Sequence, residues 1–279
     1  MSDRHVRERT VDTGDVELHV LEAGTPGHPV VLLSHGFPEL GYSWRHQLPA
    51  LAEAGYHVLA PDQRGYGRSS CPEAVEAYGI RQLTGDLVAL LDDIGADQGV
   101  VVGHDWGSMV ASHLTLLHPA RISGLVNMSV PHLPRGPMPP VQMMRQVLGD
   151  NFFYILYFQE PGVADAELGA DADRTMRRLL CGAVMAEGAV PDPANFANDG
   201  RGFVDRIPEP VGLPDWLLPA ELDHYVEEFS RTGFTGGINW YRNMDRNWAG
   251  TEALAGAKVE VPSLFIGGRL DPVLLMTPP

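Results

Sequence analysis

Val100-Val101-Val102-Gly103-His104-Asp105-Trp106-Gly107 is an apolar run that leads directly into a small-x-Asp-x-small turn. The apolar run predicts a buried strand, and the spacing of apolar residues from Met109 to Leu117 predicts a helix. The two glycines permit a sharp turn between strand and helix, which would hold the side chain of Asp105 out above the sheet. The alternative interpretation of Asp105 is an aspartate that caps the following helix.

The residue at the centre of this turn decides the chemistry that the turn can support. Serine is the usual residue there in hydrolases, and it attacks an acyl carbon. A carboxylate such as Asp105, already ionised at neutral pH, can instead displace a leaving group from a saturated carbon. The ester then belongs to Asp105 itself, and water must attack its carbonyl carbon.

Strands and helices alternate on both sides of this turn. The first predicted strand alternates like a half-buried strand, and the others are apolar on both faces, which is typical of a parallel sheet covered by helices on both sides. The predicted strands are Val16–Glu22, Val30–Ser34, His57–Ala60 and Ile122–Met128, and the predicted helices are Trp44–Ala54 and Ile80–Ile94.

The alternation stops after Ser129. A proline-rich loop follows, and residues 141–255 have helical stretches rich in Met, Phe, Tyr and Trp. Val261–Gly267 then predicts one more buried strand. We therefore expect an α/β core formed by residues 1–131 and 257–279, with residues 132–256 inserted as a helical lid.

Two further turns follow predicted strands. His35-Gly36-Phe37-Pro38-Glu39 comes directly after the strand at Val30–Ser34, and its backbone N–H groups could face the turn at Asp105. The glycine-rich segment after the next strand lacks the Gly-Lys-Ser/Thr of a phosphate loop, so we interpret it as structural. That segment is Asp62-Gln63-Arg64-Gly65-Tyr66-Gly67-Arg68-Ser69.

Composition limits the partners of the protein. The 279 residues carry a formal net charge of −16, and an acidic surface repels nucleic acid and anionic membranes. No apolar run approaches a membrane span and no signal peptide is visible, so a cytoplasmic protein is expected. Cys71, Cys181 and the eleven histidines form no metal-ligand pattern, so neither a metal nor another cofactor is expected. The oligomeric state is open, with a homodimer as one option.

The order of these elements resembles the α/β-hydrolase superfamily, with a mostly parallel sheet flanked by helices. The aspartate nucleophile narrows the resemblance to epoxide hydrolases and to haloalkane or fluoroacetate dehalogenases. Two segments of the lid, Phe153–Gly162 and Gly233–Met244, resemble the lid of soluble epoxide hydrolases of the actinobacterial type. By this match they supply the tyrosine pair of that family, Tyr154 and Tyr241, whereas Tyr157 is expected to serve in packing.

The resemblance implies hydrolysis of a small hydrophobic epoxide to a vicinal diol. Asp105 would attack the less hindered carbon, while the phenols of Tyr154 and Tyr241 would donate to the epoxide oxygen. The backbone N–H groups of Phe37 and Trp106 would hold the oxyanion of the later step. The resemblance further implies Asp271 as the acid that supports a histidine, and His35, Pro38, Phe153 and Trp240 as walls of the substrate pocket.

The histidine that the family pairs with this acid has no match. It would lie some tens of residues beyond Asp271, whereas the sequence reaches only Pro279 and has no Gly-His-Trp-type motif. We therefore expect a piece of a longer protein, without the last strand and helix of the sheet and with an exposed edge near Phe265. Such a chain would form the ester at most once. His132 and His224 are substitutes that no motif supports.

Two other functions stay open on the sequence. A haloalkane dehalogenase would use the same nucleophile but would release halide without needing Tyr154 and Tyr241. A hydrolase-like binding protein without activity would bind a ligand but leave Asp105 unmodified.

Overall fold

The computed structural model describes residues 6–182, 193–271 and 273–274, and the chain forms two compact units. The first unit comprises Met1–Arg135 and Ala253–Gly268, and the second comprises Gly136–Glu252 and Arg269–Pro279. An insertion into the first unit is the arrangement expected from the sequence, and both of its boundaries lie within four residues of the predicted ones. The described residues from Arg269 to Asp271 group with the second unit, although residues 257–279 were expected in the core.

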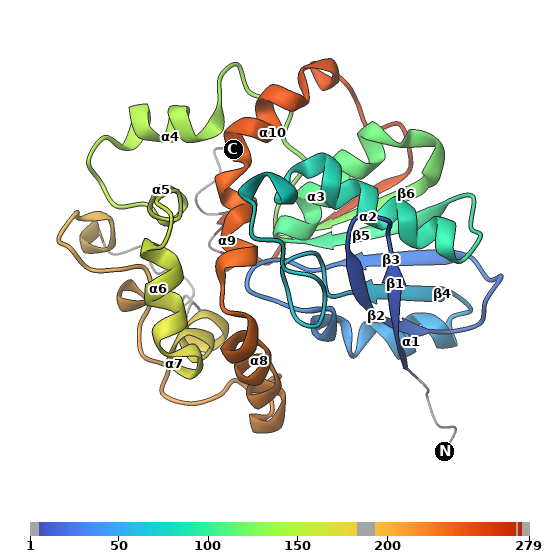
Figure 1. The fold of residues 1–279 in the computed structure, drawn as a ribbon, viewed down its shortest axis with the longest axis horizontal. Helices are drawn as coiled ribbons and strands as arrows, with labels where there is room; N and C mark the ends of the chain where they lie inside the picture. The colour runs from blue at the N-terminus through green and yellow to red at the C-terminus, as the bar shows by residue number, and fades with distance from the viewer. Residues whose placement is uncertain (1–5, 183–192, 272, 275–279) are drawn as a thin grey trace. The chain divides into compact units, whose positions relative to one another are not determined.

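The first unit is built on a seven-stranded sheet with the order β1-β2-β4-β3-β5-β6-β7 (Figure 1). Strands β4, β3, β5, β6 and β7 pair in parallel, whereas β2 is antiparallel to both β1 and β4. This mostly parallel sheet confirms the predicted fold class. The strands are β1 Arg7–Asp12, β2 Glu17–Ala23, β3 Val30–Ser34, β4 His57–Pro61, β5 Gly99–His104, β6 Ile122–Met128 and β7 Ser263–Ile266.

Helices cover both faces of this sheet. On one face, Leu48 of α1 packs with Val31, Leu33 and Val58 of the central strands. On the other face, α3 packs against β5 and β6 and against α2 (Figure 1). Burial of apolar side chains on both faces explains why the central strands lack the alternation of an exposed sheet. The helices of this unit are η1 Gly41–Trp44, α1 Gln47–Glu53, η2 Val75–Tyr78, α2 Ile80–Asp93, α3 Trp106–Leu117 and η3 Pro119–Arg121.

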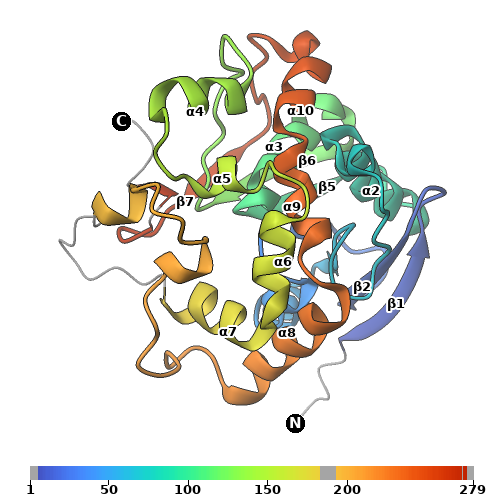
Figure 2. The same cartoon turned by 60° about the vertical axis from the view of Figure 1, so that its left-hand side comes forward.

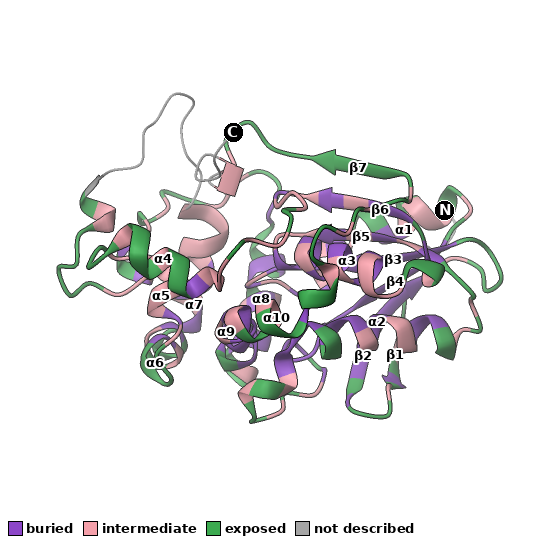
Figure 3. Cartoon of the chain, turned by 90° about the horizontal axis from the view of Figure 1, so that it is seen from above, coloured by how far each residue is buried: buried purple, intermediate pink, exposed green. Residues whose placement is uncertain are grey.

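The two edge strands differ from the expectations. β1 has the polar sequence Arg-Glu-Arg-Thr-Val-Asp with only Val11 buried, so hydrophobic periodicity could not reveal it. The predicted strand at 261–267 forms as β7, but it is exposed rather than buried (Figure 3). The exposed fractions of Leu264, Phe265 and Ile266 are 56%, 44% and 46%. The expectation of burial is therefore wrong, and that of an exposed edge is met.

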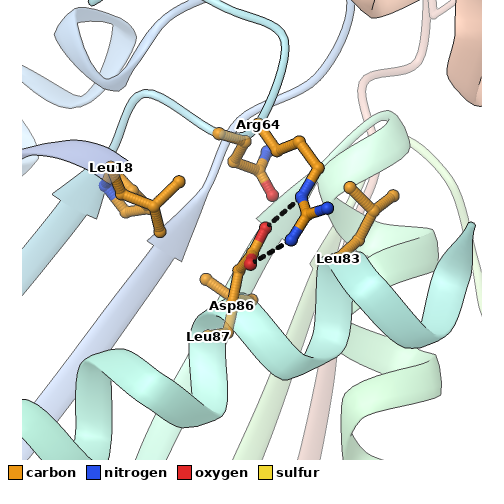
Figure 4. Close-up of a pocket in the computed structure, with 7 residues that line it drawn as sticks. Leu18, Arg64, Leu83, Asp86 and Leu87 are labelled. Carbon is orange, nitrogen blue, oxygen red and sulfur yellow. Dashed lines mark hydrogen bonds and ion pairs between the residues drawn. The ribbon is translucent and has the colours of Figure 1, made fainter. Parts of the chain in front are cut away.

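The turn after β4 is structural, as predicted. Arg64 donates from Nε and one terminal nitrogen to both carboxylate oxygens of Asp86 in α2, at 2.9 and 2.7 Å (Figure 4). Its other terminal nitrogen donates to the Ala77 carbonyl oxygen at 2.9 Å and lies 2.7 Å from the Asp15 carboxylate. The guanidinium group is thus occupied by protein acceptors that join the turn to α2.

The second unit is helical in its described residues, and no strand lies there. In this unit α7 packs against both α6 and α8, and α6 also contacts α9 (Figure 2). The helices are α4 Pro140–Leu148, α5 Tyr154–Tyr157, α6 Val163–Ala170, α7 Ala172–Arg177, η4 Arg178–Gly182, η5 Pro193–Phe196, η6 Val204–Arg206, α8 Pro219–Thr232, α9 Thr235–Arg242 and α10 Met244–Gly250, followed by η7 Glu252–Leu254.

Candidate active site

Asp105 occupies a strained turn between β5 and α3. Its backbone has φ 52° and ψ −120°, a positive φ that residues other than glycine seldom adopt. Glycine is required on both sides of Asp105 because neighbouring main-chain atoms lie too close to leave room for a Cβ. A Cβ on Gly107 would lie 2.0 Å from the carbonyl oxygen of Ser34, and one on Gly103 would lie 2.1 Å from that of Gly107. The turn predicted from the sequence is therefore present, with each glycine in a place that a larger residue could not occupy.

Ser108 fastens this turn to the neighbouring strand β6. Its hydroxyl lies 2.7 Å from the Gly103 carbonyl oxygen and 2.8 Å from that of Met128, and it accepts from the Met128 N–H at 3.0 Å. The Asp105 N–H donates to the same Met128 carbonyl oxygen at 3.2 Å. The backbone on both sides of Asp105 is thus tied to β6.

The carboxylate of Asp105 lies on backbone donors. The Phe37 N–H donates to Oδ1 at 2.9 Å, and the Trp106 backbone also hydrogen-bonds the carboxylate. Gly36 permits this contact, since a Cβ there would lie 2.4 Å from the Cβ of Asp105. The structure therefore brings together Asp105 and the two N–H groups that the sequence analysis selected.

A second carboxylate lies beside this group. Glu39 accepts from the Gly36 N–H at 2.9 Å, and the same oxygen lies 2.9 Å from Nδ1 of His104. Burial would raise the pKa of Glu39, but the positive charge and hydrogen bond of His104, together with the Gly36 N–H, lower it to about 2. Glu39 is therefore a carboxylate at neutral pH and connects the loop before it to the residue preceding Asp105.

The pKa of Asp105 is raised above its ordinary value. Burial is the largest cause, because it disfavours the charged form. The positive charge of His104 and the N–H groups of Phe37 and Trp106 act in the opposite direction, whereas the charge of Glu39 adds to the rise. The ionisation of Asp105 thus depends on donors and charges that lie within the first unit.

In the second unit, the two lid segments singled out in the sequence contact each other. The ring of Tyr154 in α5 meets that of Tyr241 in α9 edge-on, with centroids 5.9 Å apart. Gln159 donates from its side chain to the Tyr241 carbonyl oxygen at 3.2 Å, and Arg242 donates to the Phe158 carbonyl oxygen at 3.0 Å. The predicted tyrosine pair is therefore adjacent, and its role in chemistry stays a prediction.

The expected pocket walls differ in burial. His35 has no exposed surface: its Nδ1 lies 2.9 Å from the Gly36 carbonyl oxygen, and its Nε2 accepts from the Gln63 N–H at 3.0 Å. Trp240 likewise has no exposed surface, and the place of both residues in a pocket wall stays a prediction. Pro38 is buried and Phe153 is half-buried. Of these four residues, Phe153 is the least buried.

Asp271 lies at the end of the described chain. Its carboxylate accepts from the Val273 N–H at 2.9 Å, which is a turn-type contact. The proposed support of a histidine by Asp271 is not visible in this contact and stays a prediction.

Sequence reasoning missed two residues of this site. Ser108 gave no signal, since a serine early in a helix has many uses. Glu39 ends the His35–Glu39 segment but was given no role, and its spacing of three residues from Gly36 is the signal that could have found it. Among the described residues, no cluster of three or more His, Cys, Asp or Glu side chains could hold a metal ion, and no helix could cross a bilayer.

Comparison with known proteins agrees with this geometry. A family model for the alpha/beta hydrolase fold matches residues 29–276. A Mycobacterium tuberculosis protein named epoxide hydrolase A is 61% identical over 97% of this chain and 84% of its own length. Epoxide hydrolase 1 of Siraitia grosvenorii is 42% identical over 95% of this chain and 81% of its own length.

A solved structure, epoxide hydrolase A from Mycobacterium thermoresistibile, superposes with a TM-score of 0.94 and 56% identity, covering 99% of this chain and 86% of that one. These relatives favour neither the dehalogenase nor the binding protein. The chain belongs to the α/β-hydrolase fold family and, within it, to the epoxide hydrolases.

Proposed function

We propose that this chain opens an epoxide by forming a covalent ester on Asp105 and that water converts the ester to a vicinal diol. The observation that carries the proposal is the contact of Oδ1 with the Phe37 N–H at 2.9 Å in a strained strand-to-helix turn. The names of the relatives support an epoxide as the substrate.

In the first half of the proposed reaction, Oδ2 of Asp105 attacks an epoxide carbon, because Oδ1 is held by the Phe37 N–H. A C–O bond forms, the C–O bond of the ring breaks, and the electron pair goes to the epoxide oxygen. A phenol of Tyr154 or Tyr241 donates its proton to that oxygen. The adjacency of the two rings supports their action as a pair on one oxygen.

In the second half, water adds to the carbonyl carbon of the Asp105 ester and gives one proton to a base, the part that the resemblance assigns to a histidine supported by Asp271. That base then returns the proton to the tyrosine phenolate left by the first half, so no net proton is gained or lost. We expect N–H donors to stabilise the negative charge that develops on Oδ1. The proposal is supported by the Phe37 N–H, which donates to Oδ1, and by the Trp106 backbone, which hydrogen-bonds the same carboxylate. Collapse of this intermediate breaks the ester bond and releases the diol. The oxygen that joins the diol then comes from Asp105, and the new carboxylate oxygen comes from water.

The rings of Phe158 and Phe203, which contact Tyr154, support a hydrophobic substrate. Neither a metal nor a cofactor is needed for this chemistry. Since an epoxide alkylates cellular nucleophiles and a diol does not, the proposal extends to removal of reactive epoxides in the cytoplasm.

The oxygen transfer provides the test. The chain, in excess over styrene oxide, is incubated in water enriched in ¹⁸O, and the peptide that contains Asp105 is analysed by mass spectrometry. The proposal expects either a styrene oxide adduct on Asp105 or ¹⁸O in its carboxylate together with diol. Both signals must be absent from Asp105→Ala, whose fold is checked by circular dichroism. Diol without ¹⁸O in Asp105, or neither product nor adduct, would overturn the proposal.

A further inference from the structure

Tyr154 lies in a cluster of aromatic rings within the second unit. The ring of Phe203 stacks on it, with centroids 5.3 Å apart and an interplanar angle of 27°. The ring of Phe158 meets both edge-on, at 5.6 Å from Tyr154 and 5.3 Å from Phe203. Tyr241 also meets Tyr154 edge-on and Phe153 is tilted against it, whereas Phe203 lies stacked on the Tyr154 ring.

Glu167 in α6 holds the backbone of Phe203. One carboxylate oxygen of Glu167 accepts from the Phe203 N–H at 2.9 Å, and the other accepts from the Val204 N–H at 2.9 Å. Because the carboxylate accepts from two successive backbone N–H groups, it fixes both the position and the orientation of that backbone segment. Gly202 makes room for it, because a Cβ there would lie 2.2 Å from Glu167 Oε1.

The same carboxylate also reaches the helix that carries Tyr154. Tyr157 lies one turn further along α5 and hydrogen-bonds Glu167 through its side chain. Burial and this hydrogen bond raise the pKa of Tyr157, which therefore remains a donor. Tyr157 was expected to serve in packing, but the structure gives it this hydrogen bond. Glu167 in α6 is thus linked to α5 in two ways. It hydrogen-bonds Tyr157 of α5, and it holds the backbone of Phe203, whose ring stacks on Tyr154 of α5.

We propose that Glu167 and Phe203 are positioning residues for Tyr154. Stacking on Phe203 fixes the plane of the Tyr154 ring, and Glu167 fixes Phe203 relative to α5. The inference rests on the proposed function, in which a Tyr154 hydroxyl donates to the epoxide oxygen. A phenol free to change its ring orientation would donate less well, because proton donation requires the donor within hydrogen-bonding distance and correctly directed.

A double-mutant cycle tests this role. The rate of ester formation on Asp105 with styrene oxide is measured in single turnovers for the parent, Phe203→Leu, Tyr154→Phe and the double variant. We expect Phe203→Leu to lower the maximal rate about tenfold, the upper range for an aromatic pair, with the half-saturating substrate concentration little changed. In the Tyr154→Phe background the same substitution is expected to change nothing further.

Three further variants separate positioning of Tyr154 from loss of folding. Phe203→Tyr keeps the stacked ring and is expected to keep the parent rate. Glu167→Gln keeps the size of the side chain but places an amide donor against a backbone donor, so the rate falls again. Phe229→Leu removes a comparable stack, in which Phe229 and Phe234 lie 4.7 Å apart with an interplanar angle of 15°. This control is expected to lower the melting temperature and leave the rate unchanged.

The outcomes separate the two proposals. Equal losses from Phe203→Leu with and without the Tyr154 hydroxyl would show a purely structural role and overturn the inference alone. A parent rate in Tyr154→Phe, with the adduct still on Asp105, would overturn the donor role of Tyr154 and with it this inference, while leaving the Asp105 ester intact. Absence of any Asp105 adduct or ¹⁸O label would overturn the proposed function itself.

Discussion

Asp105 is held by backbone groups, whereas Tyr154 is held by side chains. Around Asp105, glycines at 36, 103 and 107 let main chains approach one another, and the carboxylate rests on N–H groups. Around Tyr154, orientation depends on neighbouring rings and on the flexible carboxylate of Glu167. The arrangement around Asp105 is rigid because a main-chain segment can shift only together with the strand or helix that contains it. The arrangement around Tyr154 can relax because side chains can change rotamer.

The largest expected effect comes from adding a methyl group to the turn at Gly103–Gly107, called here the elbow, that holds Asp105 between β5 and α3. In Gly107→Ala the new Cβ would lie 2.0 Å from the Ser34 carbonyl oxygen, so β3 or the elbow must shift. We expect ester formation to fall by about a hundredfold or more, as for a misplacement of about 1 Å near reacting atoms. Single-turnover kinetics with styrene oxide measure this loss.

The matched control is Gly85→Ala in α2, where a Cβ would meet nothing within 4 Å. It is expected to leave the rate unchanged and to stabilise the fold by roughly 0.5–1 kcal/mol, since alanine favours a helix interior. A Gly107→Ala enzyme as active as this control would contradict the rigid elbow.

The same substitution in the second unit sharpens the comparison. A Cβ on Gly202 would lie 2.2 Å from Glu167 Oε1, a separation almost as short as that at Gly107. Because the end of a glutamate side chain can rotate away, we expect Gly202→Ala to slow ester formation only a few-fold. The ratio of the two losses is the measurement. Equal losses at Gly107 and Gly202 would show that the two regions do not differ in rigidity.

The smallest expected effect concerns pH. Ester formation needs ionised Asp105, so its rate rises with pH through the pKa of that carboxyl, which burial places above the ordinary value of about 3.9. The positive charge of His104 lowers this pKa, and the charge of Glu39 raises it. Replacing His104 with glutamine should therefore raise the pKa of Asp105 and move the acidic limb of the pH–rate profile to higher pH.

This shift is followed by single turnovers across the acidic range. The Asp105 turn stays intact in the variant because its backbone is tied to β6. An acidic limb that moves to lower pH would contradict the assigned direction of the His104 charge.

The comparison also explains what the sequence could predict. The elbow was found because its requirements are local: an apolar strand, two glycines and a central residue stand within eight positions. The tyrosine pair was found only through resemblance to a family, because 87 residues separate Tyr154 from Tyr241. Glu167 and Phe203 were missed because their contact joins residues 36 apart and follows no periodic pattern.

Burial was the least predictable property. His35 and Trp240 were expected at a pocket wall, yet neither exposes any surface. The apolar pattern at 263–266 predicted a buried strand, whereas the expected lack of a further strand predicted an exposed edge near Phe265, and the stretch lies exposed at the sheet edge. In each case the residue type is compatible with either location, and the packing of distant elements decides between them.

The contact between Phe37 and Asp105 has a consequence for the energetics of the reaction. The backbone donors lose their hydration when the chain folds, because the resting carboxylate already takes the place of water. A substrate that arrives therefore needs no solvent reorganisation at these donors, and the charge that develops later on the same oxygen meets dipoles already oriented toward it. Ordering these donors therefore lowers the free energy of unfolding and does not add to the activation free energy of the chemical step.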